Sequence, residues 1–162
     1  MSNMRKNIIL LGIMCMLMSL GLSAQSVKRE FRGAWIQCVN GQFQGMGTQQ
    51  MQKTLAYQLD ELQKDGVNAI IFQVRPACDA LYESSIEPWS HFLTGVQGKA
   101  PVPYWDPLQW MIDECHKRGM ELHAWINPYR AKTKSSYTLA SNHIVTKHPE
   151  WSFRYDGLVV MN

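Results

Sequence analysis

The chain of 162 residues is long enough for one domain with its own hydrophobic core. A composition of 46% hydrophobic and 18% charged residues is typical of a globular protein and excludes an intrinsically disordered one. The formal net charge is only +3, and Lys and Arg form no stripe along the sequence, so we expect no nucleic-acid partner.

The first 24 residues have the pattern of a secretory signal peptide. Arg5 and Lys6 form a basic start, residues 8–22 are uncharged and mostly apolar, and small residues precede a cut after Ala24. An uncleaved membrane anchor is the alternative, but the run is shorter than the ~20 apolar residues that span a bilayer. The sequence therefore predicts a signal peptide over residues 1–24 and export to the periplasm, cell envelope or exterior of a bacterium. We expect no stable membrane insertion after cleavage.

Three cysteines follow this segment, Cys38, Cys78 and Cys115. An odd number cannot pair completely, and none has the short spacing of zinc ligands. Cys38 and Cys78 follow neighbouring predicted strands and could approach each other, so a disulfide between them stays open. We expect no metal ion and no cofactor, because the sequence has neither metal-ligand spacings nor a dinucleotide-binding glycine motif.

Strands and helices alternate regularly after the signal segment, with helical stretches marked by apolar residues three and four apart. Thr48 and Asp106 are the predicted N-caps of two helices, and Pro107 suits a first helical position. Gly66 and Gly119 follow the two helices as stop signals. The predicted elements are strands at 33–39, 69–75 and 121–126, and helices at 48–65 and 107–118.

The order of strand, helix and strand with short helix-to-strand turns predicts parallel strands. An open doubly wound sheet and a (β/α)8 barrel both use this order. Side-chain parity favours the barrel, because Gln73 and Arg75 share one face of their strand while Ile70, Phe72 and Val74 share the other. We expect an α/β fold made of about the first three βα units of a (β/α)8 TIM barrel, with the chain stopping before the barrel closes.

The region after residue 131 carries a weaker signal. A turn is predicted at residues 148–151, and the short apolar run at 158–161 predicts a small strand. No helix completes the third unit.

Polar and aromatic side chains gather where the predicted strands end. Gln73 and Arg75 leave the second strand, and the third places His123, Trp125 and Asn127 on one face. Because the carboxyl ends of parallel strands form the active-site face of a barrel, we expect these side chains around one hollow. Aromatic rings stack on sugar rings and polar groups bond their hydroxyls, so the pattern predicts a carbohydrate site.

Cleavage of a glycosidic bond requires two carboxyl groups. Asp79 and Glu83 are the candidates in the loop after the second strand. Asp79 could instead bind substrate, accept hydrogen bonds from backbone amides of its own loop, or pair with Arg75. His123 could equally be a hydrogen-bonded structural residue, and Trp89 could simply be packed in a turn.

Three stretches carry a resemblance to a known family: FRGAWI at 31–36, the long segment 66–98, and YWDPLQW through PYRA at 104–131. Together they resemble the N-terminal part of the glycosyl-hydrolase-like 10 family of exported (β/α)8-barrel proteins, over about residues 28–162. Cys78 and Cys115 stand where that family usually has small residues. The residues that match the family's motif positions are Arg75, Asp79, Tyr82, Trp89, His123, Trp125, Asn127 and Arg130.

The resemblance implies hydrolysis of glycosidic bonds, and members of this kind act on cell-wall glycan strands stripped of peptides. The family's acidic strand-end motif lies beyond the point where this chain ends, so the resemblance carries over binding residues without the full catalytic pair. We therefore expect residues 28–162 to be the front of an exported glycoside hydrolase, with a non-catalytic glycan-binding protein or an inactive truncated product as alternatives. Asp79 is the predicted catalytic residue. The predicted substrate-binding residues are Gln73, Arg75, Tyr82, Trp89, His123, Trp125, Asn127 and Arg130.

Overall fold

The computed structural model describes residues 30–43, 45–134 and 136–162. The chain divides into two units, Met1–Glu30 and Phe31–Asn162, and the second contains the helices and strands named below. The predicted signal peptide lies outside the described residues. Among the described helices, none has the length and apolar character needed to cross a membrane.

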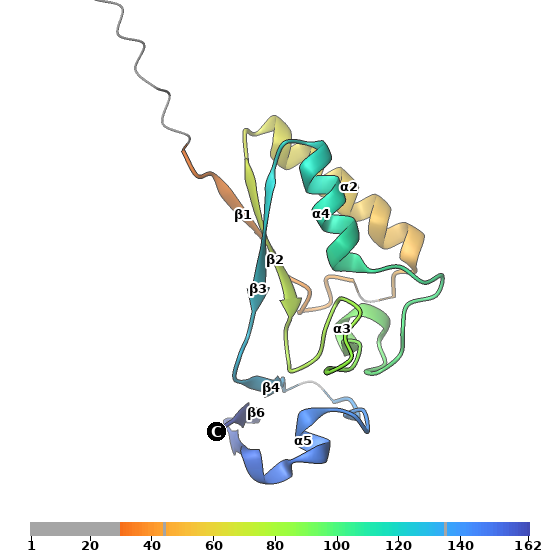
Figure 1. Ribbon diagram of the computed structural model, residues 1–162, viewed down its shortest axis with the longest axis vertical. Coiled ribbons are helices and arrows are strands. Elements are labelled where there is room, and N and C mark those ends of the chain that lie inside the picture. The colour runs from red at the N-terminus through yellow and green to blue at the C-terminus, as the bar shows by residue number, and fades with distance from the viewer. Residues whose placement is uncertain (1–29, 44, 135) are drawn as a thin grey trace, which may run out of the picture. The chain divides into compact units, whose positions relative to one another are not determined.

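Three parallel strands form the main sheet (Figure 1). They are β1 (Gly33–Ile36), β2 (Ala69–Arg75) and β3 (Glu121–Ile126), in the order β1-β2-β3. Both pairings are parallel, so the predicted strand direction and order are confirmed. The fold is mixed α/β, and its parallel sheet is compatible with consecutive units of a (β/α)8 barrel.

Strand β1 is shorter than the sequence predicts, ending at Ile36 instead of residue 39. The Cys38 amide donates a hydrogen bond of 3.1 Å to the side-chain Oε1 of Gln73 instead of joining the ladder. Asn40 then adopts a left-handed backbone with φ of 60°. A side chain on the neighbouring strand therefore ends β1, which the local sequence does not reveal.

Helix α2 (Thr48–Lys64) follows β1, but its predicted N-cap is wrong. Gly47 is the capping position, and it has no side chain to cap the helix. Thr48 is the first helical residue, and its hydroxyl donates to the carbonyl oxygen of Pro103 at 2.8 Å. The predicted apolar stripe is confirmed, and its buried members are Met51, Leu55 and Leu59.

Helix α4 (Pro107–Lys117) begins as predicted. The Asp106 carboxylate accepts the Gln109 amide at 3.0 Å, which satisfies one of the unpaired donors at the helix start. Arg118, after the last turn, donates to Asp60 of α2 at 2.7 Å and so links the two helices.

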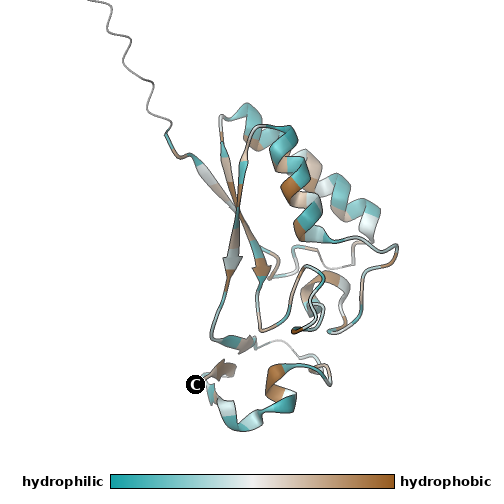
Figure 2. Ribbon diagram, in the orientation of Figure 1, coloured by the Kyte–Doolittle hydropathy of each residue, from teal (hydrophilic) through white to brown (hydrophobic). Residues whose placement is uncertain are grey.

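Both long helices cover the same side of the parallel sheet (Figure 1). The hydrophobic segments of α4 face the strands in Figure 2. Ile70, Phe72 and Val74 of β2 are almost fully buried and belong to the same core cluster as the helix stripes, so the predicted parity of β2 holds. This layer holds the strand ends in place.

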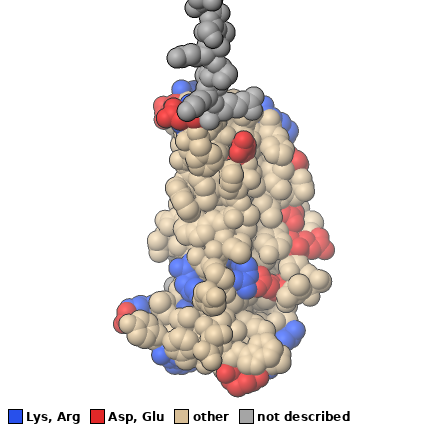
Figure 3. Space-filling model, turned by 60° about the vertical axis from the view of Figure 1, so that its left-hand side comes forward, with Lys and Arg blue, Asp and Glu red and all other residues tan. Residues whose placement is uncertain are grey.

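The other side of the parallel sheet is largely uncovered by the described residues. Trp35 of β1 is 67% exposed, and its ring meets that of Trp125 of β3 edge-on at 5.2 Å between centroids. The rings of Phe31 and His123 meet in the same way at 5.4 Å. Figure 3 shows a broad face with few charged side chains, and basic side chains gather towards the carboxyl ends of the strands.

A second, antiparallel sheet follows the parallel one. Its strands are β4 (Arg130–Lys132), β5 (Ser152–Tyr155) and β6 (Leu158–Met161), in the order β4-β6-β5. The predicted strand at 158–161 and the turn at 148–151 are confirmed, the latter as a 3-10 helix (Pro149–Trp151) preceded by the short helix α5 (Ile144–Lys147). Strands β4 and β5 were not predicted, because they are short and largely polar.

The small sheet packs on its own apolar cluster. Val159 of β6 and Ala131 of β4 bury their side chains against Cys78, which belongs to the loop after β2. The same loop contains the short helix α3 (His91–Thr94). The antiparallel sheet is therefore anchored to the carboxyl end of β2, where the predicted site residues are found.

Candidate functional site at the ends of the parallel strands

An ion pair that is mostly shielded from solvent lies at the end of β2. The Arg75 Nε donates to both carboxylate oxygens of Glu87, at 2.7 and 2.9 Å. The Arg75 Nη1 donates to the Asn127 carbonyl oxygen at 2.8 Å, just after β3. The side chains of Arg75 and Glu87 are only 20% and 15% exposed, so water screens their attraction weakly. Arg75 thus joins the end of β2 to the end of β3 through the Asn127 carbonyl, and it holds the loop after β2 through Glu87.

Two further predicted site residues are hydrogen-bonded to the carbonyl oxygen of Pro76. It accepts a hydrogen bond from Asn127 Nδ2 at 3.1 Å and another from Arg130 Nε at 2.9 Å. Asn127 in turn accepts the indole N–H of Trp125 at 3.2 Å. The structure therefore brings Arg75, Trp125, Asn127 and Arg130 together, as the sequence predicts.

A hollow of about 500 Å³ opens beside this cluster. Arg75 and Glu87 contribute opposite charges to its wall, and Lys147 and His148 add groups from the C-terminal segment. Tyr129 is 65% exposed and offers an aromatic ring at the same place. This mixture of ring, ion pair and amide suits a ligand with hydroxyl groups. The lining residues are Arg75, Cys78, Ile86, Glu87, Pro88, Pro128, Tyr129, Asn142, Ile144, Lys147, His148, Met161 and Asn162.

Asp79 is fully buried and does not line that hollow. Its carboxylate accepts the Ala77 amide at 3.1 Å and the Gln97 side-chain amide at 2.9 Å. Burial raises the pKa of Asp79, and the hydrogen bonds from Gln97, Ser90 and Ala77 oppose the rise. Of the alternatives open to Asp79 in the sequence, the structure shows bonding to its own loop and no pairing with Arg75.

His123 lies apart from the arginine cluster. In the sheet it pairs with Ile71, well before the strand end, and its Nε2 is 3.2 Å from a carboxylate oxygen of Glu121. Its ring contacts Phe31 on the uncovered face. The expectation that His123 would share a hollow with Arg75 and Asn127 is therefore wrong, because shared parity places side chains on one face but not at one height along the strand.

Three other predicted binding residues lie in or against the protein core and do not line the strand-end hollow: Gln73, Tyr82 and Trp89. The Gln73 side chain is fully buried and accepts the amide and thiol of Cys38. Tyr82 and Trp89 are half-buried and pack against the main core. Burial, followed by the negative charge of Glu87, raises the pKa of Tyr82.

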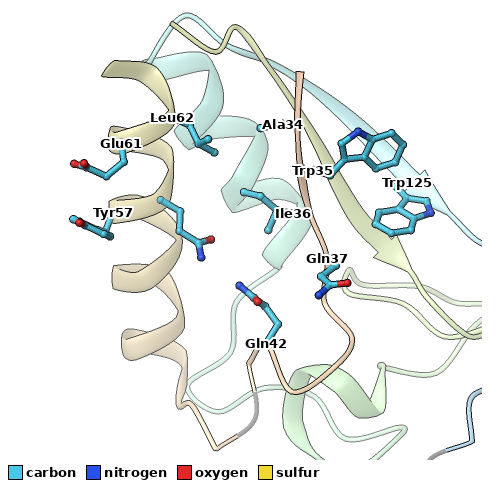
Figure 4. A pocket seen from close by; sticks show the side chains of 10 residues that line it. Ala34, Trp35, Ile36, Gln37, Gln42, Tyr57, Glu61, Leu62 and Trp125 are labelled. Atoms are coloured by element: carbon cyan, nitrogen blue, oxygen red, sulfur yellow. The ribbon is translucent and has the colours of Figure 1, made fainter. Parts of the chain in front are cut away.

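A second hollow, of about 650 Å³, lies between β1 and α2 (Figure 4). Trp35 and Trp125 stand together at one side, while Tyr57 and Glu61 come from the helix at the other. It differs from the strand-end hollow in having no basic residue among its lining.

Four residues of the strand-end hollow had no role in the sequence-based prediction. Glu87 was not considered as a partner of Arg75, because Asp79 and Glu83 lie nearer to Arg75 in the sequence. Tyr129 lies shortly after Asn127 in the segment that leaves β3, and this position could have indicated a role in the site. Lys147 and His148 come from a segment with no sequence pattern that points to the site.

The cysteines Cys38, Cys78 and Cys115 are free thiols in the structure, and all three are buried. Cys38 contacts Gln73, while the Cys78 thiol approaches the Arg130 carbonyl oxygen at 3.7 Å. The Cys38–Cys78 disulfide left open by the sequence is thus not formed. Within the described residues, no three His, Cys, Asp or Glu side chains group closely enough to hold a metal ion.

Comparison with known proteins places this chain in a family. The Glycosyl hydrolase-like 10 family matches residues 30–161. Glycosyl hydrolase YngK of Bacillus subtilis (strain 168) is 42% identical over 139 residues, a match that covers 82% of this chain and 27% of YngK. Glycosyl hydrolase DigH of Escherichia coli (strain K12) is 45% identical over 100 residues, covering 60% of this chain and 22% of DigH.

The chain therefore spans about a quarter of the length of these curated relatives. The family match extends over the parallel sheet, the arginine cluster and the antiparallel sheet. The resemblance seen in the sequence is confirmed, and the chain belongs to the Glycosyl hydrolase-like 10 family.

Proposed function

We propose that this chain forms the first part of a glycoside hydrolase barrel and binds a polysaccharide at the ends of its parallel strands. The observation that carries the proposal is the convergence of Asn127 and Arg130 on the Pro76 carbonyl, beside a hollow that contains Arg75, Glu87 and Tyr129. Ligands of barrel enzymes bind at this end of the strands. The glycosyl hydrolase names of YngK and DigH support a glycan as the ligand.

The chemistry of the hollow suits glycan binding more fully than glycan cleavage. Hydrolysis requires a carboxylic acid and a carboxylate on opposite sides of the scissile bond. Among the described residues that line the hollow, Glu87 is the one acidic side chain, and both of its carboxylate oxygens already accept hydrogen bonds from Arg75. A second carboxyl group has to come from another part of the catalytic domain.

The proposed substrate is the glycan strand of peptidoglycan after removal of its peptides. This choice follows from the family resemblance and fits a hollow that presents a ring, an ion pair and amide groups. Neutral sugar rings stack on Tyr129, and acidic or acetamido substituents bond to the basic and amide groups around it.

Glycan-release assays test the proposal with two polypeptides. One is this chain. The other is a chimera in which this chain replaces the matching region of YngK and is followed by the remaining part of YngK. We expect release of soluble glycan from peptide-free peptidoglycan by the chimera, and loss of that release when Arg75 and Tyr129 are both replaced by Ala. Peptidoglycan that keeps its peptides is the matched control substrate. A chimera that folds and neither binds nor cleaves glycan contradicts the proposal.

A non-catalytic glycan-binding protein is the second candidate. The single acidic residue in the hollow favours it, because binding needs no acid/base pair. Binding of glycan by both polypeptides without release by either distinguishes this candidate from the hydrolase.

Export is a further part of the proposal. Signal-peptide cleavage after Ala24 predicts a mature protein that begins at Gln25, found outside the cytoplasm. N-terminal sequencing of the protein from periplasmic or culture fractions tests this. A variant with Glu in place of Arg5 and Lys6 serves as the control, and it should remain in the cytoplasm. A full-length protein in the cytoplasmic fraction of the unaltered strain contradicts export.

A further inference from the structure

Four polar side chains are buried together beneath the strand-end hollow. Asp79, Ser90 and His143 are fully buried, and Gln97 is 6% exposed. They come from three separate segments of the chain: the turn after β2, the region of α3, and the loop before α5. Burying polar groups is costly unless each finds a hydrogen-bond partner, so their connections indicate what the group does.

The hydrogen bonds form a chain, called the relay below, in which the donor and the acceptor of each bond are fixed. The Ala77 amide donates to one oxygen of Asp79 at 3.1 Å, and the Gln97 side-chain amide donates to the other at 2.9 Å. The opposite end of the Gln97 side chain accepts the Ala140 amide at 2.9 Å. Asp79 therefore has to be an acceptor at both oxygens, and Gln97 has to be a donor towards Asp79.

His143 makes a second connection between the same two segments of the chain. Its Nδ1 accepts the Val145 amide at 3.2 Å, so the ring proton lies on Nε2. That Nε2 lies 3.0 Å from the Ala77 carbonyl oxygen and donates to it. The turn that contains Ala77 and Asp79 is thus bonded twice to the segment 140–145.

The same two segments form facing parts of the hollow. Cys78, between Ala77 and Asp79, lines it, and so do Asn142 and Ile144 on either side of His143. Alternate residues therefore point into the hollow and into the relay. The Pro76 carbonyl that holds Asn127 and Arg130 belongs to the same turn.

From this geometry we infer that Asp79 is a positioning residue that sets the separation of the two walls of the glycan-binding hollow. Its carboxylate acts through Gln97 and the backbone and does not reach the ligand. The identity of the ligand rests on the proposed function, whereas the role of the relay rests on the contacts alone.

The direction of the relay gives an informative pair of substitutions. In Asp79→Asn, the new amide nitrogen faces the nitrogen of Gln97 or, after rotation of the Asn side chain, the Ala77 N–H. Rotating the Gln97 amide instead turns its nitrogen towards the Ala140 amide. One pair of donors therefore meets in every arrangement. In the double variant Asp79→Asn/Gln97→Glu, the amide donates to the new carboxylate, and that carboxylate also accepts the Ala140 amide. The swap restores the hydrogen bonds and moves the charge to position 97.

The experiment measures amide hydrogen exchange at Ala77 and Ala140, the melting temperature, and the affinity of the full chain for glycan. We expect exchange at one of these two amides to be about tenfold faster in Asp79→Asn, and the melting temperature to fall by about 4 °C. Both values should return towards those of the unaltered chain in the double variant, and glycan affinity should fall and recover in parallel. The exposed pair Gln109–Asp113 on α4, joined by a similar 3.0 Å bond, gives the matched control Asp113→Asn, for which no change is expected.

Turnover in the chimera separates positioning from catalysis. A positioning role raises KM in Asp79→Asn and is rescued by the double variant, since the reacting groups are intact. A catalytic role lowers kcat by about 10³-fold or more in both variants, because the carboxylate is displaced in each. The inference is overturned by that kcat pattern, by exchange at Ala77 and Ala140 that Asp79→Asn leaves unchanged, or by faster exchange that the double variant does not slow. If the exchange pattern holds while no glycan binds, the positioning role stands and the proposed function fails.

Discussion

Arg75 and Glu87 are twelve positions apart and form an ion pair at the end of β2, in which Nε donates to both carboxylate oxygens and Nη2 contacts Oε1. The same guanidinium reaches the backbone beyond β3. The pair therefore fixes the long loop after β2 against the neighbouring strand end, which is where the glycan site is proposed.

Replacing Glu87 by Gln should destabilise the fold markedly. The substitution leaves the Arg75 charge in a place with little access to water, and removal of one partner from a buried pair costs about 3 kcal/mol or more. Urea unfolding measures the change in the free energy of unfolding. Asp156→Asn breaks the exposed pair with Lys134 and is the control, with an expected loss of less than about 1 kcal/mol. Equal losses in the two variants would show that the Arg75–Glu87 pair is as well hydrated as a surface pair.

The buried Asp79 should make stability fall as the pH rises. Burial raises the pKa of its carboxyl in the folded state, so the folded protein holds this proton more tightly than the unfolded chain does. The resulting stabilisation is fully present below the unfolded pKa of about 3.9 and is lost as pH increases through the raised folded pKa.

Asp79→Asn removes this titration. Free energies of unfolding should therefore show the unaltered protein losing stability relative to Asp79→Asn between pH 4 and the raised folded pKa. A difference that grows in favour of the unaltered protein as pH rises would mean that the hydrogen bonds to the carboxylate outweigh its burial.

Tyr129 should contribute directly to glycan binding. Its exposed ring lines the strand-end hollow, and loss of a stacking aromatic side chain costs more than about 1 kcal/mol in typical binding sites. Calorimetric titration with peptide-free glycan fragments should show affinity reduced about fivefold to tenfold in Tyr129→Ala. Tyr57→Ala is a matched control, because Tyr57 is 64% exposed but lies on α2, in the other hollow. Equal effects of the two substitutions would place the glycan elsewhere.

The three described cysteines should behave as slow-reacting free thiols. Burial raises the pKa of Cys115 to about 11 and also raises those of Cys38 and Cys78, so little reactive thiolate exists at pH 8. Mass spectrometry should show slow alkylation of the folded protein. In urea without reductant, Cys38, Cys78 and Cys115 should all be alkylated at once. Protection of Cys38 and Cys78 until a reductant is added would demonstrate a disulfide.

Local sequence patterns were sufficient for the parallel layer. Apolar spacing located α2 and α4, and Asp106 with Pro107 marked the start of α4, because these signals act within a few residues. The short turns between helix and strand implied parallel pairing. The same patterns placed Arg75, Asn127 and Arg130 at neighbouring strand ends. In the structure Asn127 and Arg130 both bond the Pro76 carbonyl, and Arg75 bonds the Asn127 carbonyl.

Long-range contacts were beyond these patterns. The end of β1 depends on Gln73, the burial of Asp79 on Gln97, and the small sheet on the pairing of β4 with β6. None of these partners lies within a helical turn or a hairpin of the group that it holds. Local periodicity in the sequence therefore does not indicate these contacts.

By itself, then, the sequence determined the order and direction of the parallel strands and the polar residues that leave them. Only the tertiary structure decided that Arg75 binds Glu87, that His123 stays on the open face, and that Asp79 is sealed beneath the hollow. The physical reason is that backbone preference and side-chain parity act locally. The burial and charge partner of a side chain, in contrast, depend on segments that meet only when the chain has folded.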